Sequence, residues 1–300
     1  MLAVTILGNN SAIPAHGRHP TAQIITTPGE LLLFDCGEGT QIQILNYRIK
    51  RSRINHIFIS HLHGDHYFGL IGLLNSFALL GRIQPLHVYG PPPLREVLDL
   101  QFRLSDTTLP YPFTFHPVEQ DGLVLDAPLY TVEAFSTRHR IPCRGFLVRE
   151  KKNLRKVVAA EAMRHQVPPS FYRNLQQGED YVLPSGEVVP NAALTRDNSR
   201  PKSYAFTADT QYDPALAEVV KGVDLLYHET TYLHAFSEQA MTRYHATTKQ
   251  AASIAQAAGV KKLLIGHFSA KFDDLSLFET ETREVFPHSE IALEGTTYLV

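Results

Sequence analysis

Four short apolar runs in this chain each lead into a side chain that can bind a metal ion. They are HIFIS before His61, YAFTADT with Asp209, DLLYHET with His228 and Glu229, and KKLLIGHFS with His267. Apolar runs of about three to five residues, bounded by charge or glycine, predict buried strands. Side chains just beyond the carboxyl end of a strand lie at the sheet edge, where loops gather and sites are built. The pattern therefore predicts a buried sheet that carries a polar site at one edge.

Helical patterns lie between these predicted strands. One spans Tyr67–Leu80, a second follows Pro214, and a third begins near Thr247 or Thr248 and ends at Gly259. The early segments LAVTILG, AQIITT and ELLLFDCGEGTQ predict further strands. Because strands and helices alternate in both halves, we expect an α/β fold in which two sheets are sandwiched between helices.

Composition limits the classes of protein to which the chain can belong. Its 300 residues are 44% hydrophobic and 19% charged, which suits one large globular domain over residues 1–300. The net charge is −2, so nucleic acid would have to bind through local basic patches. Two cysteines, Cys36 and Cys143, provide neither a disulfide framework nor a metal knuckle. The chain shows no signal-peptide pattern and no run of roughly 18 apolar residues, so we expect a soluble, cytoplasmic protein and no membrane partner.

Three histidines and one aspartate lie within the six positions of HLHGDH. His61 and His63 are two residues apart, so an extended segment points both imidazoles to one side. Gly64 lets the chain turn, so that Asp65 and His66 can face a second ion. Zinc binds imidazole nitrogen and carboxylate oxygen at about 2.0–2.1 Å. Burying four such side chains without partners would cost several kcal/mol, so the motif favours a metal site over a structural role.

Two metal ions need more ligands than this motif supplies. Single polar residues after the other apolar runs are candidates, although each alone would more often be structural. Two ions about 3.5–4 Å apart lower the pKa of a shared water and bind a phosphate oxygen, and Asp65 can accept the proton of that water. The predicted first site has His61, His63 and His139, the predicted second site has Asp65, His66 and His267, and Asp209 bridges the two.

The segment Lys151–Arg173 differs from the rest of the chain. It carries six Lys or Arg residues against one Glu and continues into polar, turn-rich sequence through Arg200. A solvated charged helix is one interpretation, and a phosphate-contacting arm is the other. A second basic cluster precedes the histidine motif, and it fits a solvated loop as well as a binding patch. Its members are Arg48, Lys50, Arg51 and Arg53.

The histidine motif with its downstream His, Asp and His resembles that of the metallo-β-lactamase superfamily. Further segments over about Leu2–Leu299 are similar to ribonuclease Z, the zinc endonuclease that trims the 3′ trailer from precursor tRNA. These segments are LGNNSAIPA, LLLFDCGEGTQIQIL, INHIFISHLHGDHYFGLIGLL, VYGPPPL, YAFTADT, LLYHETTY, YHATTKQAA and LLIGHFSAKF. Two segments, VPPSFY and DNSRPKSY, depart from the family pattern near the arm and before Asp209.

The resemblance implies a fold and a set of roles. The fold is a four-layer αββα sandwich with a small protruding arm at about residues 150–175. The cofactor is two Zn²⁺ per chain, with Mn²⁺ or another divalent metal as an alternative. Glu229 matches a glutamate that steers a catalytic histidine, and that histidine matches His245, which would donate a proton or a hydrogen bond to the departing 3′-oxygen. Asp35, Glu38 and Gln41 are expected to support or rim the site. The residues that match zinc ligands are His61, His63, Asp65, His66, His139, Asp209 and His267.

The resemblance also implies how substrate is held. In the family the arm grips tRNA that is bound at the partner subunit of a homodimer, so we expect a homodimer here. The expected RNA-binding residues are Lys151, Lys152, Arg155, Lys156, Arg164 and Arg173.

The function expected from the sequence is zinc-dependent endonucleolytic removal of the 3′ trailer from precursor tRNA. Metal-activated hydroxide would attack phosphorus, leaving a 3′-hydroxyl on the tRNA and a 5′-phosphate on the trailer. A related dinuclear zinc phosphodiesterase or sulfatase that acts on small esters is the alternative. An inactive RNA-binding protein is a weaker alternative because all seven expected ligands are present, and a β-lactamase is weaker still because the chain shows no signal-peptide pattern. The metal motif alone is also compatible with thioester hydrolysis.

Overall fold

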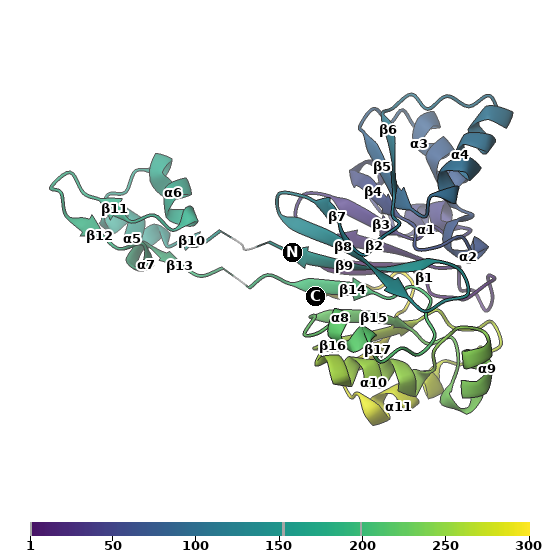
Figure 1. The fold of residues 1–300 in the computed structure, drawn as a ribbon. Coiled ribbons are helices and arrows are strands. Elements are labelled where there is room, and N and C mark those ends of the chain that lie inside the picture. The colour runs from purple at the N-terminus through teal and green to yellow at the C-terminus, as the bar shows by residue number, and fades with distance from the viewer. Residues whose placement is uncertain (1, 152–153, 199) are drawn as a thin grey trace. The chain divides into compact units, whose positions relative to one another are not determined.

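The computed structural model divides the chain into two compact units (Figure 1). The main unit comprises Met1–Arg149 and Lys202–Val300, and the small unit comprises Glu150–Pro201. The expectation of one domain over residues 1–300 with an arm inserted at about 150–175 stays a prediction. The structure describes residues 2–151, 154–198 and 200–300.

The main unit contains two seven-stranded sheets. The first sheet has the order β18-β1-β2-β3-β4-β5-β6, and it is antiparallel from β18 to β3 and parallel from β3 to β6. Its strands are β1 (Ala3–Gly8), β2 (Ala22–Thr26), β3 (Leu31–Phe34), β4 (Ile54–Phe58), β5 (Leu86–Gly90), β6 (Phe113–Pro117) and β18 (Thr297–Leu299).

The second sheet has the order β17-β16-β15-β14-β9-β8-β7. Strands β14 to β17 are parallel to one another, and β9 runs antiparallel to β14. The strands are β7 (Gly122–Asp126), β8 (Tyr130–Thr137), β9 (Cys143–Glu150), β14 (Ser203–Phe206), β15 (Leu225–Glu229), β16 (Lys262–Gly266) and β17 (Ser289–Ile291).

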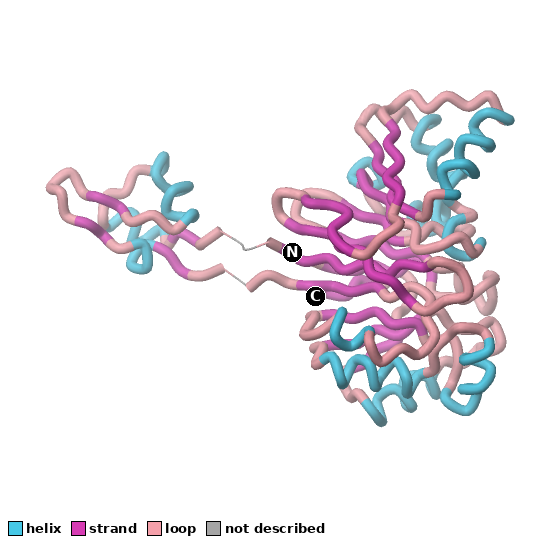
Figure 2. Tube along the Cα trace, viewed as in Figure 1, coloured by secondary structure: helices cyan, strands magenta, loops and turns pink. Residues whose placement is uncertain are grey.

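An aromatic core joins the inner faces of the two sheets. Phe34 of the first sheet lies with its ring centroid 5.2 Å from that of Phe146 and 5.9 Å from that of Phe206, both in the second sheet. All three side chains are fully buried. Helices cover the outer faces, as Figures 1 and 2 show. The predicted α/β sandwich of two sheets between helices is therefore confirmed.

The helices begin and end close to the predicted positions. Thr247 caps α10, where its backbone N–H donates to Gln250 Oε1 at 3.0 Å, and Gly259 ends that helix with φ +62°. The single helix expected over Tyr67–Leu80 is instead split between α2 and α3, where the Gly69 N–H donates to the Cys36 carbonyl at 2.9 Å and not to the preceding helical turn. The helices of the main unit are α1 (Thr40–Asn46), α2 (Gly64–Tyr67), α3 (Leu70–Leu79), α4 (Pro93–Leu104), α8 (Leu216–Val219), α9 (Ser237–Thr242), α10 (Thr248–Ala258) and α11 (Ser276–Val285), with 3₁₀ turns η1 (Arg51–Arg53) and η3 (His234–Phe236).

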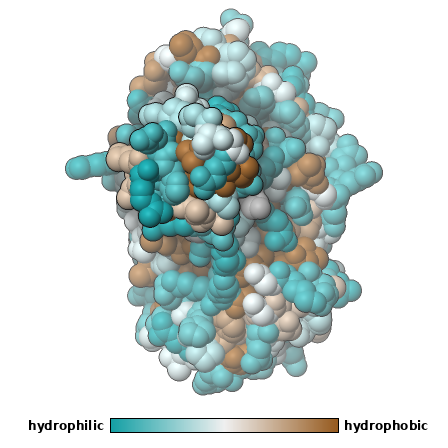
Figure 3. All heavy atoms as spheres, turned by 90° about the vertical axis from the view of Figure 1, so that its left-hand side faces the viewer, coloured by the Kyte–Doolittle hydropathy of each residue, from teal (hydrophilic) through white to brown (hydrophobic). Residues whose placement is uncertain are grey.

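The small unit has its own modest core. Its hydrophobic cluster has five buried side chains: Ala162, Val167, Leu175, Val189 and Leu194. Asn191 ties the unit together, because its side-chain amide donates to the carbonyls of Leu175 and Glu179 at 2.8 and 2.7 Å. On the face that Figure 3 shows, hydrophilic and hydrophobic side chains are mixed. The elements of the small unit are β10 (Lys156–Val157), α5 (Ala159–Arg164), η2 (Pro169–Phe171), α6 (Tyr172–Gln177), β11 (Tyr181–Val182), β12 (Val188–Val189), α7 (Asn191–Leu194) and β13 (Thr195–Arg196).

Within the described residues, no helix is both long enough and apolar enough to cross a membrane.

Candidate metal centre

The ends of several strands bring the predicted metal ligands together. His61 follows β4, Asp209 follows β14 and His267 follows β16, each within three residues of the strand end. His139 lies two residues beyond β8. Strand β14 is buried throughout and β16 is buried beyond its first residue, so the sheet fixes the positions of Asp209 and His267.

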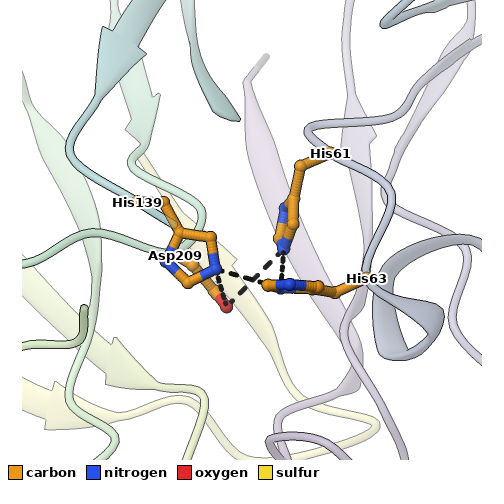
Figure 4. A group of neighbouring side chains, drawn as sticks. All are labelled: His61, His63, His139 and Asp209. Carbon is orange, nitrogen blue, oxygen red and sulfur yellow. Dashed lines mark hydrogen bonds and ion pairs between the residues drawn. The ribbon is translucent and has the colours of Figure 1, made fainter. Parts of the chain in front are cut away.

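Three histidines and Asp209 form the first group of ligand atoms (Figure 4). His63 Nδ1 lies 3.1 Å from His61 Nε2 and 3.0 Å from His139 Nε2. Asp209 Oδ2 lies 3.8 Å from both His61 Nε2 and His139 Nε2. Two ligand atoms bound tetrahedrally to zinc are about 3.3–3.4 Å apart, given bonds of about 2.0–2.1 Å. The spacing of this group therefore suits one divalent cation.

Asp65, His66 and His267 form the second group, with the other oxygen of Asp209 beside it. Asp65 Oδ2 lies 3.5 Å from His66 Nε2 and 3.4 Å from His267 Nε2. Asp209 Oδ1 lies 3.4 Å from His66 Nε2 and 3.1 Å from His267 Nε2. Asp209 thus directs one carboxylate oxygen at each group, which is the arrangement of a bridging ligand.

Three buried atoms at the centre support the presence of a cation. His66 Nε2, His267 Nε2 and Asp209 Oδ1 have no hydrogen-bond partner among the residues that the structure describes. Buried polar atoms in proteins nearly always have a partner, and each one left without costs about 1–3 kcal/mol. A divalent cation would satisfy all three atoms at once, so the residues present fit such an ion.

Hydrogen bonds on the far side of each ring orient four of these histidines. A proton on Nδ1 leaves the lone pair on Nε2, which is the nitrogen that faces the centre. For His66 and His139 the Nδ1 proton follows from the partner, because a carboxylate faces His66 Nδ1 and a backbone carbonyl faces His139 Nδ1, and both groups accept hydrogen bonds. The pairs are His61 Nδ1 with Ser60 Oγ at 2.9 Å, His66 Nδ1 with Asp35 Oδ2 at 2.7 Å, His139 Nδ1 with the Tyr244 carbonyl at 3.0 Å and His267 Nδ1 with Thr231 Oγ1 at 2.9 Å.

Asp35 supports both groups of ligand atoms. Besides His66, its carboxylate accepts the backbone N–H of Ser60 at 2.8 Å and the Ser60 hydroxyl at 2.9 Å, and that hydroxyl faces His61. Asp35 has φ +55°, a conformation that costs a non-glycine residue on the order of 1 kcal/mol. Of the two neighbours also expected at the site, Gln41 accepts a hydrogen bond from Ser76 and Glu38 is exposed, and neither belongs to a ligand group.

The charges of the centre favour bound cations. Burial lowers the pKa of His61 well below 6.5, so its imidazole is neutral at pH 7 and keeps a lone pair for a metal. Burial acts in the same direction on His66, but Asp209, Asp65 and Asp35 outweigh it and raise the pKa of His66 well above 6.5. Negative charge is therefore concentrated around His66, and positive charge is stabilised there.

Glu229 and His245 form a hydrogen-bonded pair beside the centre. His245 Nδ1 donates to Glu229 Oε1 at 2.8 Å, across 16 positions of sequence. Burial alone would lower the pKa of His245, but the charge of Glu229 and this hydrogen bond outweigh it and raise the pKa to about 9. His245 also belongs to a third possible ligand group with Asp209 and His267. The expected role of His245 as a proton donor stays a prediction.

A cleft of about 530 Å³ opens over the centre. Asp65, Asp209 and His245 line its floor, and Phe68, Arg140, Arg243 and Tyr244 line its exposed wall. The backbone N–H of Ala12 also enters the cleft and donates to Asp65 Oδ2 at 2.7 Å. A dinuclear metal site below an open cleft with arginines in its wall can bind and hydrolyse a phosphodiester.

Comparison with known proteins gives matches over the whole chain. Proteins named ribonuclease Z are 42% identical over 292 residues in Bacteroides fragilis strain YCH46, covering 97% of this chain and 96% of that protein. The identity is 40% over 294 residues in Parabacteroides distasonis, covering 97% of each chain. This chain belongs to the ribonuclease Z family. A family model described as anti-Pycsar protein Apyc1 also matches, but over residues 2–154 only.

Solved structures agree with the ribonuclease Z assignment. Human tRNase Z, short form, is 27% identical, superposes with a TM-score of 0.72 and covers 99% of each chain. The metallo-β-lactamase fold protein YhfI from Bacillus subtilis is 19% identical with a TM-score of 0.70 and covers 100% of each chain. The resemblance drawn from the sequence, in family and in fold, is thereby confirmed.

The residues predicted to bind RNA lie in the small unit, and Lys152 is outside the described residues. Lys156 in β10 and Arg173 in α6 are exposed. Arg155 donates to Thr195 Oγ1 at 2.7 Å and also bonds Asp197, while Arg164 pairs with Glu161 at 2.8 Å. Lys151 is half-buried.

Sequence reasoning missed several residues of the site. The supporting hydroxyls of Ser60 and Thr231 and the cleft arginines Arg140 and Arg243 were not identified. Each lies within two residues of a predicted site residue, and that adjacency was the available signal. Ala12 acts through its backbone N–H, which no side-chain pattern reveals.

Proposed function

We propose that this chain is a metal-dependent endoribonuclease that removes the 3′ trailer from precursor tRNA, leaving a tRNA 3′-hydroxyl and a trailer 5′-phosphate. The observation that carries the proposal is the pair of ligand groups joined through the two oxygens of Asp209. Full-length similarity to proteins named ribonuclease Z and to human tRNase Z supports tRNA as the substrate.

The proposed cofactor is two Zn²⁺ per chain, with Mn²⁺ or another divalent metal as the alternative. His61, His63 and His139 would hold one ion, Asp65, His66 and His267 the other, and Asp209 both. Two such ions supply a deprotonated water at neutral pH and neutralise charge on phosphate oxygens.

The chain's own residues provide the proton transfers and the geometry. The Asp65 carboxylate would accept the proton of the attacking water, and the Ala12 N–H, 2.7 Å from its Oδ2, holds this carboxylate in place. His245 carries a proton at pH 7 because its pKa is raised to about 9 by Glu229, against the effect of burial. With Nδ1 held by Glu229, its Nε2 proton is left for the departing 3′-oxygen.

We assign tRNA binding to the small unit and the chemistry to the main unit. The exposed cations Lys156 and Arg173 are placed to contact phosphates, which lets an acidic chain bind RNA locally. The homodimer stays part of the proposal, and an exposed apolar face on α1 and α3 that includes Ile42, Leu45 and Leu79 supports it. Light scattering of the purified protein would test the dimer. The cytoplasmic location likewise stays a prediction.

The test is cleavage of a 3′-extended precursor tRNA by zinc-loaded protein with mapped product ends. We expect one cut after the discriminator base, abolished in Asp65→Ala and retained in the control Asp99→Ala, which alters an exposed aspartate on α4. If zinc binds and bis(4-nitrophenyl) phosphate is hydrolysed while the tRNA stays intact, the alternative small-ester phosphodiesterase or sulfatase replaces this proposal.

A further inference from the structure

We propose that Thr231 is a positioning residue that couples the proton donor His245 to the metal ligand His267 through one hydroxyl group. The proposal rests on the function proposed above and assigns a new role within the same site. Thr231 lies two residues beyond Glu229, which ends β15, and its side chain is buried. Thr231 does not line the cleft.

The contacts of Thr231 form a continuous chain across the site. Its Oγ1 lies 2.9 Å from His267 Nδ1 and 2.7 Å from Glu229 Oε2. The other oxygen of that carboxylate, Oε1, accepts from His245 Nδ1 at 2.8 Å. The chain therefore runs His267–Thr231–Glu229–His245, and every member is buried or nearly so.

The direction of each hydrogen bond in this chain is fixed by chemistry. Glu229 as a carboxylate only accepts, so the single proton of the Thr231 hydroxyl is donated to Oε2. Oγ1 then has only lone pairs to offer His267, so Nδ1 of that ring must carry the proton. With the proton on Nδ1, the lone pair of His267 is on Nε2, which faces Asp65 and Asp209 at 3.4 and 3.1 Å.

Thr231 therefore acts on both sides of the site. Towards His267, its hydroxyl selects the tautomer that can bind a cation. Towards Glu229, its hydroxyl and its backbone N–H at 3.0 Å together hold Oε2, which orients Oε1 for His245. Thr210 N–H completes the carboxylate's partners with a bond to Oε1 at 3.1 Å. Without the hydroxyl, the His267 Nδ1 proton loses its acceptor and the Glu229 carboxylate can rotate.

The neighbouring Thr230 provides a matched control. It is as buried as Thr231, but its hydroxyl donates to the Gly266 carbonyl at 3.3 Å and contacts neither Glu229 nor His267. Thr230→Val and Thr231→Val remove the same atom from adjacent buried positions. Thr231→Ser restores the hydroxyl alone.

The experiment compares these three variants of the full chain with the unmodified protein. Zinc affinity is measured by chelator competition, and the imidazole ¹⁵N signals of His245 and His267 are recorded on the zinc-loaded protein. We expect Thr231→Val to lower the affinity for the zinc ion that His267 would hold by roughly 10–100-fold, which is the usual effect of removing a partner of a metal ligand. The signals of both rings should move in Thr231→Val only, and Thr231→Ser should restore affinity and signals. On precursor tRNA, Thr231→Val should lower kcat and leave KM unchanged.

Three results would overturn the proposal. One is a Thr231→Val protein that matches Thr230→Val in zinc affinity and ring signals. Another is a change confined to one of the two rings, which would remove the coupling. The third is a failure of Thr231→Ser to restore the wild-type values. Because affinity and ring signals need no substrate, they decide on Thr231 even if precursor tRNA is not cut, an outcome that would refute only the proposed function.

Discussion

The two units of this chain differ in how firmly they hold their functional side chains. In the main unit, each of four histidines has a partner on its far nitrogen. Three of these partners, Asp35, Ser60 and Thr231, lie within two residues of a strand end. Among the described residues of the small unit, the strands β10 to β13 have two residues each and no helix exceeds six. Lys156 and Arg173 are exposed, and Arg155 and Arg164 form surface ion pairs, which contribute only about 0–1 kcal/mol each. The difference indicates that the main unit holds its site side chains in fixed positions, whereas the cations of the small unit can adjust to what they contact.

The largest expected effect comes from Asp209, which joins the two ligand groups. Asp209→Asn keeps the shape but removes the charge shared by both proposed ions. We expect kcat on precursor tRNA to fall by more than about 100-fold, because removing only a hydrogen-bond partner of a metal ligand already lowers metal affinity or activity by about 10–100-fold. Zinc content should fall in the same variant, as measured by atomic absorption. The control is Asp99→Asn. If Asp209→Asn has the same zinc content and the same activity as this control, Asp209 is not a metal ligand.

Removing the small unit tests whether tRNA binding and phosphodiester hydrolysis belong to different units, as proposed. Arg149 of β9 pairs with Ser203 of β14, so a short glycine–serine turn in place of residues 151–201 can close a hairpin and leaves both strands whole. We expect KM for precursor tRNA to rise on the order of tenfold or more, because phosphate contacts are lost. Turnover of bis(4-nitrophenyl) phosphate should not change.

Two outcomes would count against this division of roles. Unchanged KM on precursor tRNA would place RNA binding in the main unit. A fall in small-ester turnover together with zinc loss would show that the small unit supports the metal centre.

The same difference explains how far sequence reasoning could go. His61 and His63 were predictable because their spacing is local, and Asp209 was predictable because it follows an apolar run. The pairing of Glu229 with His245 required the family resemblance, because their contact depends on how β15 and the loop before α10 are placed in space. Thr231 was not predictable, since a single hydroxyl becomes a partner of His267 only once β15 and β16 are known to be neighbours. In the small unit, the ladder of β10 and β13 joins residues 40 apart through two pairs, too few to leave a pattern.

A core substitution in the small unit should have a moderate and local effect. Leu194 is fully buried in a cluster of only five buried side chains. Leu194→Ala should lower the free energy of unfolding of this unit by about 2–3 kcal/mol, and hydrogen exchange would show faster exchange in residues 154–198. Zinc content and small-ester turnover should be those of the unmodified protein. Loss of zinc from this variant would mean that the two units are energetically coupled.

The smallest expected effect is that of one exposed cation. Lys156 lies directly opposite Arg196 in the β10–β13 ladder, where two like charges repel each other unless an anion lies between them. Lys156→Ala should therefore weaken binding of precursor tRNA a few-fold and lower the slope of log affinity against log salt concentration by about 1. Lys221→Ala is the matched control, because Lys221 is an exposed lysine of the main unit paired with Glu218. Equal salt slopes in both variants would show that this pair of cations does not contact phosphate, and the repulsion would then need another explanation.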